Sequence, residues 1–437
     1  MNSVAIVVLD TLRYDLFEDN FEWLDGKWYS NAYSTSHWTV PAHASLYTGK
    51  YPSEVGVHGT SVWLTCEEET IAETFRSAGY STSLISANPH IYMWPGWDRG
   101  FDASFGPSQL RPGSENLVDW QQYFAKNDTE GPRRYLDAVK YCVNSEKNTF
   151  KSIISGIKAT FSARKKGAKN IRERVRQTNY DGDQFLCINL MDAHTPYNPP
   201  KSYTDCDVPV DVVAADAFSD SVNNADEIRQ AYFDSCSYLS TIYKDIFNEL
   251  SKQFDYIVTL SDHGEMLGEY GMWNHSYGLY PELTHIPLVI SGDEIENEKI
   301  SDAVNILDVH QTVCDLSGAE VKSRGRNILE SFDRKELLTE YKGLLSWHRE
   351  QFARAGISEE TFEEHNPSLD GIVTESGEYG YETHREGIKT TEKLSIEDAK
   401  EKIKTLKTQL DQKDVQDVQE SEVSDNVKKQ LKDLGYA

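Results

Sequence analysis

The chain has 437 residues and is strongly acidic, with 71 aspartates and glutamates against 44 lysines and arginines, a net charge of −27. That charge argues against nucleic acid or an anionic membrane as a partner, because its long-range field repels both. Hydrophobic residues make up 38% of the chain, which excludes global disorder. The acidic residues are spread along the chain, so we interpret them as a solvated, halophilic kind of surface rather than a binding tail.

The first residues and the cysteines indicate a cytoplasmic protein. Residues 1–10 lack a basic region and have only a short apolar run, which predicts a strand rather than a signal peptide. No stretch approaches the roughly 18 apolar residues of a membrane span. The six cysteines include no CxxC pair and no regular spacing, so we expect buried thiols rather than a disulfide framework.

Short apolar and β-branched runs, separated by helical patterns, predict an α/β fold with a mostly parallel sheet. The run at residues 4–9 is continuously apolar, which is typical of a strand buried on both faces. The other expected strands are 81–86, 184–190, 254–260 and 286–290, and the clearest expected helices are 70–78 and 225–250.

Residues 34–49 are predicted to form a loop that becomes a short helix. Thr39 stands at the expected N-cap, Pro41 in the first turn, and Gly49 just past the end. A hydroxyl at a helix start lies among unpaired backbone N–H groups, where an anion can bind. By itself the pattern is also explained by ordinary helix capping.

Two segments depart from the strand–helix alternation. Residues 107–180 are polar and charged, and we interpret them as an inserted helical segment rather than a core element. Its basic patch, Arg164-Lys165-Lys166, either forms a solvated helix face, the reading we favour, or contacts an anionic substrate.

The chain after residue 345 is expected to form a small α+β subdomain. Residues 371–373 and 379–383 predict short antiparallel strands, 395–410 a charged helix, and the end of the chain a charged helical tail. This pattern divides the chain into a larger domain at 1–345, which carries the chemistry-bearing residues described next, and a subdomain at 346–437.

Chemistry-bearing residues follow several of the predicted strands, namely Asp10, His194, Asp262 and His263. In parallel sheets, functional residues collect past the carboxyl ends of the strands. Asp10, Asp262 and His263 offer carboxylate oxygens and one imidazole, a set that suits Mn, Mg, Ca or Zn. Taken singly, each is better explained as a solvated turn acid or a packed histidine, but three together at strand ends favour a metal site.

Several motifs support one family resemblance. They are Asp10-Thr11-Leu12-Arg13, the Thr39-Val40-Pro41 loop that runs to Thr48-Gly49-Lys50-Tyr51-Pro52, Gly100-Phe101-Asp102, His194-Thr195-Pro196-Tyr197, Ser261-Asp262-His263-Gly264-Glu265 with Leu267-Gly268-Glu269, and the final Leu434-Gly435-Tyr436. In this order they resemble the sulfatase branch of the alkaline phosphatase superfamily, over most of residues 1–330. The resemblance implies a three-layer α/β sandwich with a mostly parallel central sheet and a small C-terminal α+β subdomain.

The resemblance also implies a role for individual residues. It assigns Asp10, Asp262 and His263 as metal ligands, and Thr39 as the nucleophile whose oxygen also binds the metal. It places His194 and His275 where they contact the ester or protonate the leaving group, and Asn88 and His43 where they contact the substrate. Two-zinc members carry an Asp and a His four residues apart near His194, whereas Asp192 is only two residues away, which favours one divalent ion.

The residue at position 39 departs from the sulfatase pattern. Sulfatases of this family convert a Cys or Ser to formylglycine and carry an Arg four residues later, but here the residues are Thr39 and His43. Oxidation of threonine gives a ketone, so the aldehyde mechanism is disfavoured. We therefore expect a metal-dependent hydrolase or transferase that cleaves a phosphate mono- or diester of a small molecule or glycan through unmodified Thr39. A sulfatase that uses unmodified Thr39, or a non-catalytic binding protein of polysaccharide metabolism, remain alternatives.

Overall fold

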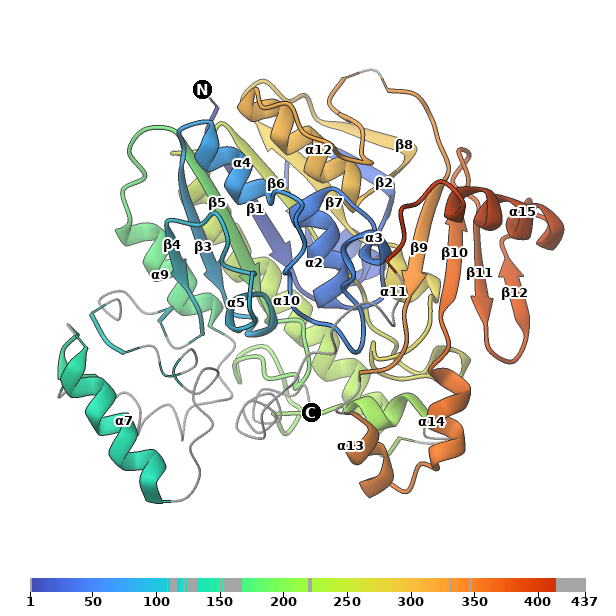
Figure 1. Cartoon of the computed structure of the whole chain (residues 1–437), viewed down its shortest axis with the longest axis horizontal. Coiled ribbons are helices and arrows are strands. Elements are labelled where there is room, and N and C mark those ends of the chain that lie inside the picture. Colours follow the sequence, from blue (N-terminus) through green and yellow to red (C-terminus); the bar gives the residue numbers. More distant parts are fainter. Residues whose placement is uncertain are drawn as a thin grey trace.

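A computed structural model describes residues 2–107, 109–110, 116–118, 120, 123, 132–145, 147–149, 151–152, 167–218, 222–330, 332–345 and 348–413. Its central feature is an eight-stranded sheet with the order β4-β3-β5-β1-β6-β7-β2-β8 (Figure 1). The strands are β1 (Val4–Leu9), β2 (Lys27–Tyr33), β3 (Ser81–Ser86), β4 (Ala103–Phe105), β5 (Gln184–Leu190), β6 (Tyr256–Leu260), β7 (Leu288–Gly292) and β8 (Glu298–Asn305). Only β7 runs antiparallel to its neighbours, so the sheet is mostly parallel as expected.

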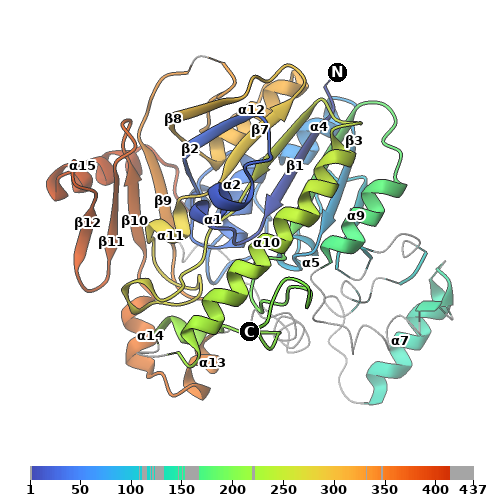
Figure 2. The ribbon, with the colours of Figure 1, turned by 180° about the vertical axis from the view of Figure 1, so that it is seen from behind.

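Helices cover both faces of the sheet and complete the expected three-layer sandwich. On one face lie α2 (Thr39–Thr48), α4 (Ile71–Ser77) and α12 (Ile306–Ser317) (Figure 1). On the other face lie α1 (Tyr14–Asn20), α9 (Ala168–Gln177) and α10 (Ala225–Leu250) (Figure 2). Short helices occupy the connections: α3 (Pro52–Val55), α5 (His90–Met93), α11 (Pro281–Thr284), η1 (Ala214–Phe218) and η2 (Glu269–Gly271), and α7 (Pro132–Asn144) precedes α9. Among the described residues, no helix is both long and apolar enough to span a bilayer.

A second, antiparallel sheet lies beside the first, in the order β12-β11-β10-β9 (Figure 1). Its strands are β9 (Leu337–Tyr341), β10 (Leu369–Val373), β11 (Tyr379–Thr383) and β12 (Gly387–Thr390), accompanied by α13 (His348–Arg354), α14 (Glu359–His365) and α15 (Ile396–Lys407). The two expected short strands and the charged helix are therefore present. The small sheet already begins at Leu337, and the division of the chain at residue 345 stays a prediction.

The small sheet is joined to the loop that precedes α2. The backbone N–H of Glu340 donates to the carbonyl of Thr35 at 2.8 Å, and the Ser36 hydroxyl donates to the carbonyl of Glu340 at 2.7 Å. The Glu340 carboxylate also accepts from the backbone N–H of Ser53 at 2.9 Å. The second sheet thus fixes the segment that leads to Thr39.

The interpretation of residues 107–180 as an insert outside the core is wrong for α9. Ile171 and Val175 on this helix are fully buried in the main hydrophobic core. Arg172 pairs with Asp245 of α10 at 2.8 Å, which holds α9 against the longer helix. Charged residues outnumber apolar ones in α9, so its overall composition does not indicate that one face of the helix is buried. The basic patch at 164–166 and the C-terminal tail from residue 414 lie outside the described residues.

Replacing Ile171 with alanine is expected to lower the free energy of unfolding by about 2–5 kcal/mol, because it leaves a cavity in the main core. Val139→Ala on α7 is the matched control: its side chain is 45% exposed, so the change should stay within about 0.5 kcal/mol. Urea unfolding of both variants measures the difference. Equal losses in the free energy of unfolding for the two variants would contradict the position of α9 in the main core.

Candidate active site

The polar residues predicted at the strand ends meet at one edge of the large sheet. Asp10 directly follows β1, and Asp262 and His263 follow β6, its hydrogen-bonded neighbour. Their ligand atoms all lie within 4.8 Å of one another, and all three side chains are buried. The Asp262 Oδ2 atom is buried without a hydrogen-bond partner in the described part of the chain, and it lies 3.6 Å from His263 Nε2.

The charges in this cluster fit a divalent cation. Burial raises the pKa of the Asp10 carboxyl, but the His194 and His263 rings and two amide donors outweigh burial and bring it below its usual range. Burial and then the charge of Asp10 raise the pKa of Asp262 well above its usual range. A divalent cation among these atoms would stabilise both carboxylates in their ionised form and would satisfy Asp262 Oδ2. The donors are oxygens and one imidazole, which suit a hard or borderline ion.

The His263 ring is held in one tautomer. Its Nδ1 lies 2.9 Å from the carbonyl oxygen of Gly264 and donates to it, so Nε2 carries the lone pair. Burial and the neighbouring His275 lower the pKa of His263 to about 3. The ring is therefore neutral, and Nε2 is available as a metal ligand or hydrogen-bond acceptor.

Thr39 points its hydroxyl at the same cluster. Its Oγ1 lies 3.2 Å from His263 Nε2 and 3.4 Å from Asn88 Nδ2. The structure corrects one expectation: Trp38 is the N-cap of α2 and Thr39 is the first helical residue, with no capping hydrogen bond from either side chain. The hydroxyl is thus directed into the cluster rather than into the helix. Gly49 ends the helix at φ 66°, as predicted.

Two asparagines orient Asp10, and sequence reasoning identified only one of them. Asn88, just after β3, and Asn189, on β5, donate to Asp10 Oδ2 at 2.7 and 2.9 Å. The hydroxyl of Thr11, whose φ is 66°, donates to Asp10 Oδ1 at 2.9 Å. The adjacent strands β3, β5, β1 and β6 therefore each place a polar side chain at the same edge of the large sheet. The single amide in the otherwise apolar run 185–190 was the available signal for Asn189.

His43 lies one helical turn after Thr39 and borders the cluster. Its Nδ1 donates to the carbonyl oxygen of Thr39 at 3.0 Å and lies 3.5 Å from Asp262 Oδ2. Burial lowers the pKa of His43 to about 4, so the ring is neutral at pH 7. Its Nε2 is buried and has no hydrogen-bond partner among the residues described.

His194 and His275 complete the cluster. The centre of the His275 ring lies 4.6 Å from that of His263 and 4.9 Å from that of His194. Nδ1 of His194 donates to the carbonyl of Thr195 at 2.5 Å. All eight predicted site residues are therefore brought together by the fold. Glu265, which lies 3.0 Å from His275 Nδ1, was missed, although it stands beside His263 in the Ser261-Asp262-His263-Gly264-Glu265 motif.

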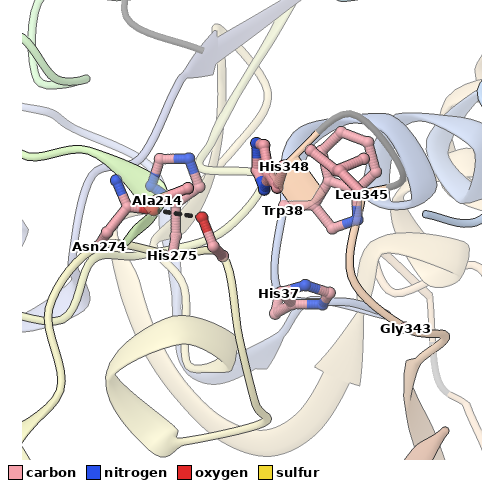
Figure 3. Close-up of a pocket in the computed structure, with 9 residues that line it drawn as sticks. His37, Trp38, Ala214, Asn274, His275, Gly343, Leu345 and His348 are labelled. Carbon is pink, nitrogen blue, oxygen red and sulfur yellow. Dashed lines mark hydrogen bonds between the residues drawn. The ribbon is translucent and has the colours of Figure 1, made fainter. Parts of the chain in front are cut away.

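A recess opens beside His275 and is lined by loops and short helices that follow strands of both sheets (Figure 3). Trp38 and His37 come from the loop before α2, and Leu345 and His348 come from the segment after β9. None of the described residues that line it is an acid, a lysine or an arginine. The recess therefore offers a wall of imidazole and indole rings, small side chains and one leucine next to the histidine cluster.

The site thus has a hydroxyl facing carboxylates and imidazoles, past the carboxyl ends of a mostly parallel sheet, which is the arrangement that the resemblance to the alkaline phosphatase superfamily implies. The sulfatase family model matches residues 19–319, so the chain belongs to the sulfatase family, a family of hydrolases that generally use a divalent metal.

Individual relatives agree with this assignment. The choline-sulfatase of Rhizobium meliloti is 25% identical over 370 residues, which are 73% of this chain and 68% of that protein. The low-salt glycan biosynthesis sulfotransferase Agl7 of Haloferax volcanii is 21% identical over 334 residues, 73% of this chain and 62% of that protein. This chain thus spans about two thirds of the length of these relatives. Among solved structures, the phosphonate monoester hydrolase of Silicibacter pomeroyi superposes with a TM-score of 0.61 at 16% identity, covering 94% of each chain, which shows the shared fold.

Proposed function

We propose that this protein is a metal-dependent hydrolase or transferase of phosphate esters in which unmodified Thr39 is the nucleophile. The observation that supports it is the position of Thr39 Oγ1, 3.2 Å from His263 Nε2 at the edge of the candidate metal cluster. Threonine cannot form the formylglycine aldehyde, so the hydroxyl itself must attack.

The residues of the cluster divide the reaction between them. A divalent cation held by Asp10, Asp262 and His263 would lower the pKa of the Thr39 hydroxyl and offset charge on the ester oxygens. Thr39 Oγ1 attacks phosphorus as its proton leaves to solvent, the bond to the leaving oxygen breaks, and His275 or His194 gives that oxygen a proton. Water, or an acceptor hydroxyl in a transferase, then attacks the phosphothreonine. The bond between phosphorus and Thr39 Oγ1 breaks, Thr39 takes a proton back from solvent, and the histidine takes one from the attacking group.

The charge of the site favours an ester that carries one negative charge. In the described part of the chain, no lysine or arginine forms an ion pair or side-chain hydrogen bond with Asp10, Asp262 or His263. His43 and His263 are neutral because burial lowers the pKa of each. Two carboxylates and a divalent cation sum to zero, and the histidine that protonates the leaving oxygen adds one positive charge, which matches one negative charge on the ester rather than the two of a phosphate monoester. We therefore favour a phosphodiester within the phosphate-ester class.

A sulfate ester is the second candidate, because it also carries a single negative charge and because sulfatases and a sulfotransferase are among the relatives. Catalysis would again use unmodified Thr39. For either ester, we assign the leaving group to the recess beside His275. Its wall has no acid, lysine or arginine among the described lining residues, and with Trp38 and Leu345 it suits a neutral ring such as an aryl or sugar group.

The substrate class is tested by measuring kcat/KM on an aryl phosphate, a bis-aryl phosphate and an aryl sulfate, each with Mn, Mg, Ca and Zn. We expect the bis-aryl phosphate to exceed the aryl phosphate by about tenfold or more, the effect of one uncompensated charge. A higher value for the aryl sulfate would favour the second candidate. Stoichiometric metal without turnover of any ester would indicate a non-catalytic binding protein.

A further inference from the structure

A completely buried carboxylate, Glu265, uses both of its oxygens at the active site. Oε1 lies 3.0 Å from Nδ1 of His275, and Oε2 accepts from the hydroxyl of Tyr197 at 3.0 Å. Tyr197 is itself fully buried, and it stands 68 positions from Glu265 in the chain. Two segments far apart in sequence are thus brought to one carboxylate.

The backbone that carries Glu265 is also fixed. The Nη1 atom of Arg13 donates to the carbonyl of Glu265 at 3.3 Å. Beside it, the chain packs so closely that a Cβ added to Gly264 would lie 2.0 Å from the carbonyl oxygen of Glu282. The carboxylate therefore has little freedom to turn away from the histidine. Burying a carboxylate is costly unless it is hydrogen-bonded, so an acid at this position indicates a role that packing alone does not require.

The contact determines which nitrogen of His275 is presented to the substrate. A carboxylate is an acceptor, so Nδ1 of His275 donates to Glu265 and Nε2 is the atom left for other partners. The His275 ring lines the recess with Trp38 on one side and touches the His263 ring on the other. Because the proposed function assigns the leaving group to this recess, Nε2 is the His275 atom offered to the leaving oxygen.

We propose that Glu265 is a positioning residue which, braced by Tyr197, holds Nε2 of His275 against the leaving-group oxygen. This inference rests on the proposed ester-cleaving function and extends it by assigning His275, rather than His194, to the leaving group. Tyr197 acts indirectly, because its hydroxyl donates to Oε2 of Glu265 and so fixes the rotation of that carboxylate.

The test is Glu265→Gln in the metal-loaded enzyme, with a series of aryl phosphodiesters whose leaving phenols differ in pKa. Glutamine has the same size as glutamate, and its amide oxygen can still accept a hydrogen bond from the Tyr197 hydroxyl. Its amide nitrogen is a donor, however, and it faces Nδ1 of His275, where the carboxylate accepted a hydrogen bond. For the phenols of highest pKa we expect kcat to fall about 100-fold, the usual contribution of one acid–base group, with KM unchanged. For nitrophenyl esters, whose leaving group needs no assistance, the loss should stay within about threefold.

Two further variants separate positioning from a structural effect. Tyr197→Phe leaves the carboxylate in place and should give a smaller loss with the same dependence on the leaving group. Glu54→Gln is the matched control: this buried carboxylate of α3 pairs with Arg324 at 2.6 Å, so the leaving-group dependence should not change. A loss in Glu265→Gln that is equal for all phenols, or one reproduced by Glu54→Gln, would overturn the inference.

A spectroscopic measurement tests the same contact without turnover. Long-range ¹H–¹⁵N spectra should show His275 protonated on Nδ1 in the wild-type protein, and a change of tautomer in Glu265→Gln. A wild-type His275 that carries its proton on Nε2 alone would contradict the role of Glu265. The proposed function has its own test, independent of Glu265. Mass spectrometry of the wild-type enzyme during turnover would contradict that function if it found no covalent adduct on Thr39.

Discussion

Thr39→Ala is expected to lower kcat/KM by about 10⁴-fold or more, because removal of a nucleophile leaves only the binding and electrostatic contributions of the site. Metal binding should be affected far less. Asp10, Asp262 and His263 remain in place, so the affinity for the divalent cation should fall by no more than about tenfold, the effect of losing a secondary contact. Loss of turnover with retention of metal is the signature expected of the nucleophile.

A matched control lies at the other end of the same helix. Thr48 is also a buried threonine of α2, but its hydroxyl donates to the carbonyl of Ala44 at 2.7 Å and faces away from the cluster residues. Thr48→Ala should therefore retain wild-type kcat/KM. Turnover is measured on the best substrate of the ester panel, and intact-mass analysis of the quenched enzyme detects the adduct. Wild-type turnover by Thr39→Ala would show that water, not Thr39, attacks the ester.

Asp262→Asn is expected to lose metal binding and activity together. The substitution removes the carboxylate oxygen that is buried without a hydrogen-bond partner in the described residues, and it leaves one carboxylate and one imidazole for the cation. In the wild-type protein, cation at 100 times its Kd should raise the free energy of unfolding by about 2.7 kcal/mol. The variant should show almost none of this gain at the same concentration.

Thermal unfolding with a chelator and with added cation, together with metal analysis of the dialysed protein, measures this difference. Asp308→Asn is the control for loss of a buried carboxylate, since Asp308 pairs with Arg326 at 2.6 Å near the start of α12. That variant should be less stable in both conditions but should keep the cation-dependent gain. A full metal complement in Asp262→Asn would contradict the assignment of Asp262 as a ligand.

Much of the fold could be read from local sequence patterns because the central strands are buried on both faces. Val4–Leu9, Ser81–Ser86 and Gln184–Leu190 coincide with the predicted strands. Lys27–Tyr33 and Glu298–Asn305 were not predicted, because strands near the edge of the sheet mix polar and apolar residues. The reversed direction of β7 also has no local signal, since a short apolar run does not reveal which way it will pair.

The sequence by itself determined the residues that follow the buried strands and the helix start. Asp10, Thr39, Asp262 and His263 lie at positions that local periodicity, glycines and helix signals mark, and the family motifs point to the same residues. Their assembly into one cluster followed from the general rule that parallel strands present their carboxyl ends at one edge.

Only the tertiary structure decided which groups orient that cluster. Asn189 reaches Asp10 because β5 pairs with β1 in a particular register, and Glu265 meets His275 and Tyr197 because the connection after β6 and the loop after β5 fold over the same edge. The recess likewise joins Trp38 to Leu345, which lie on segments connected by the second sheet. These contacts depend on register and loop packing between distant segments, and neither property is encoded in a local pattern of residues.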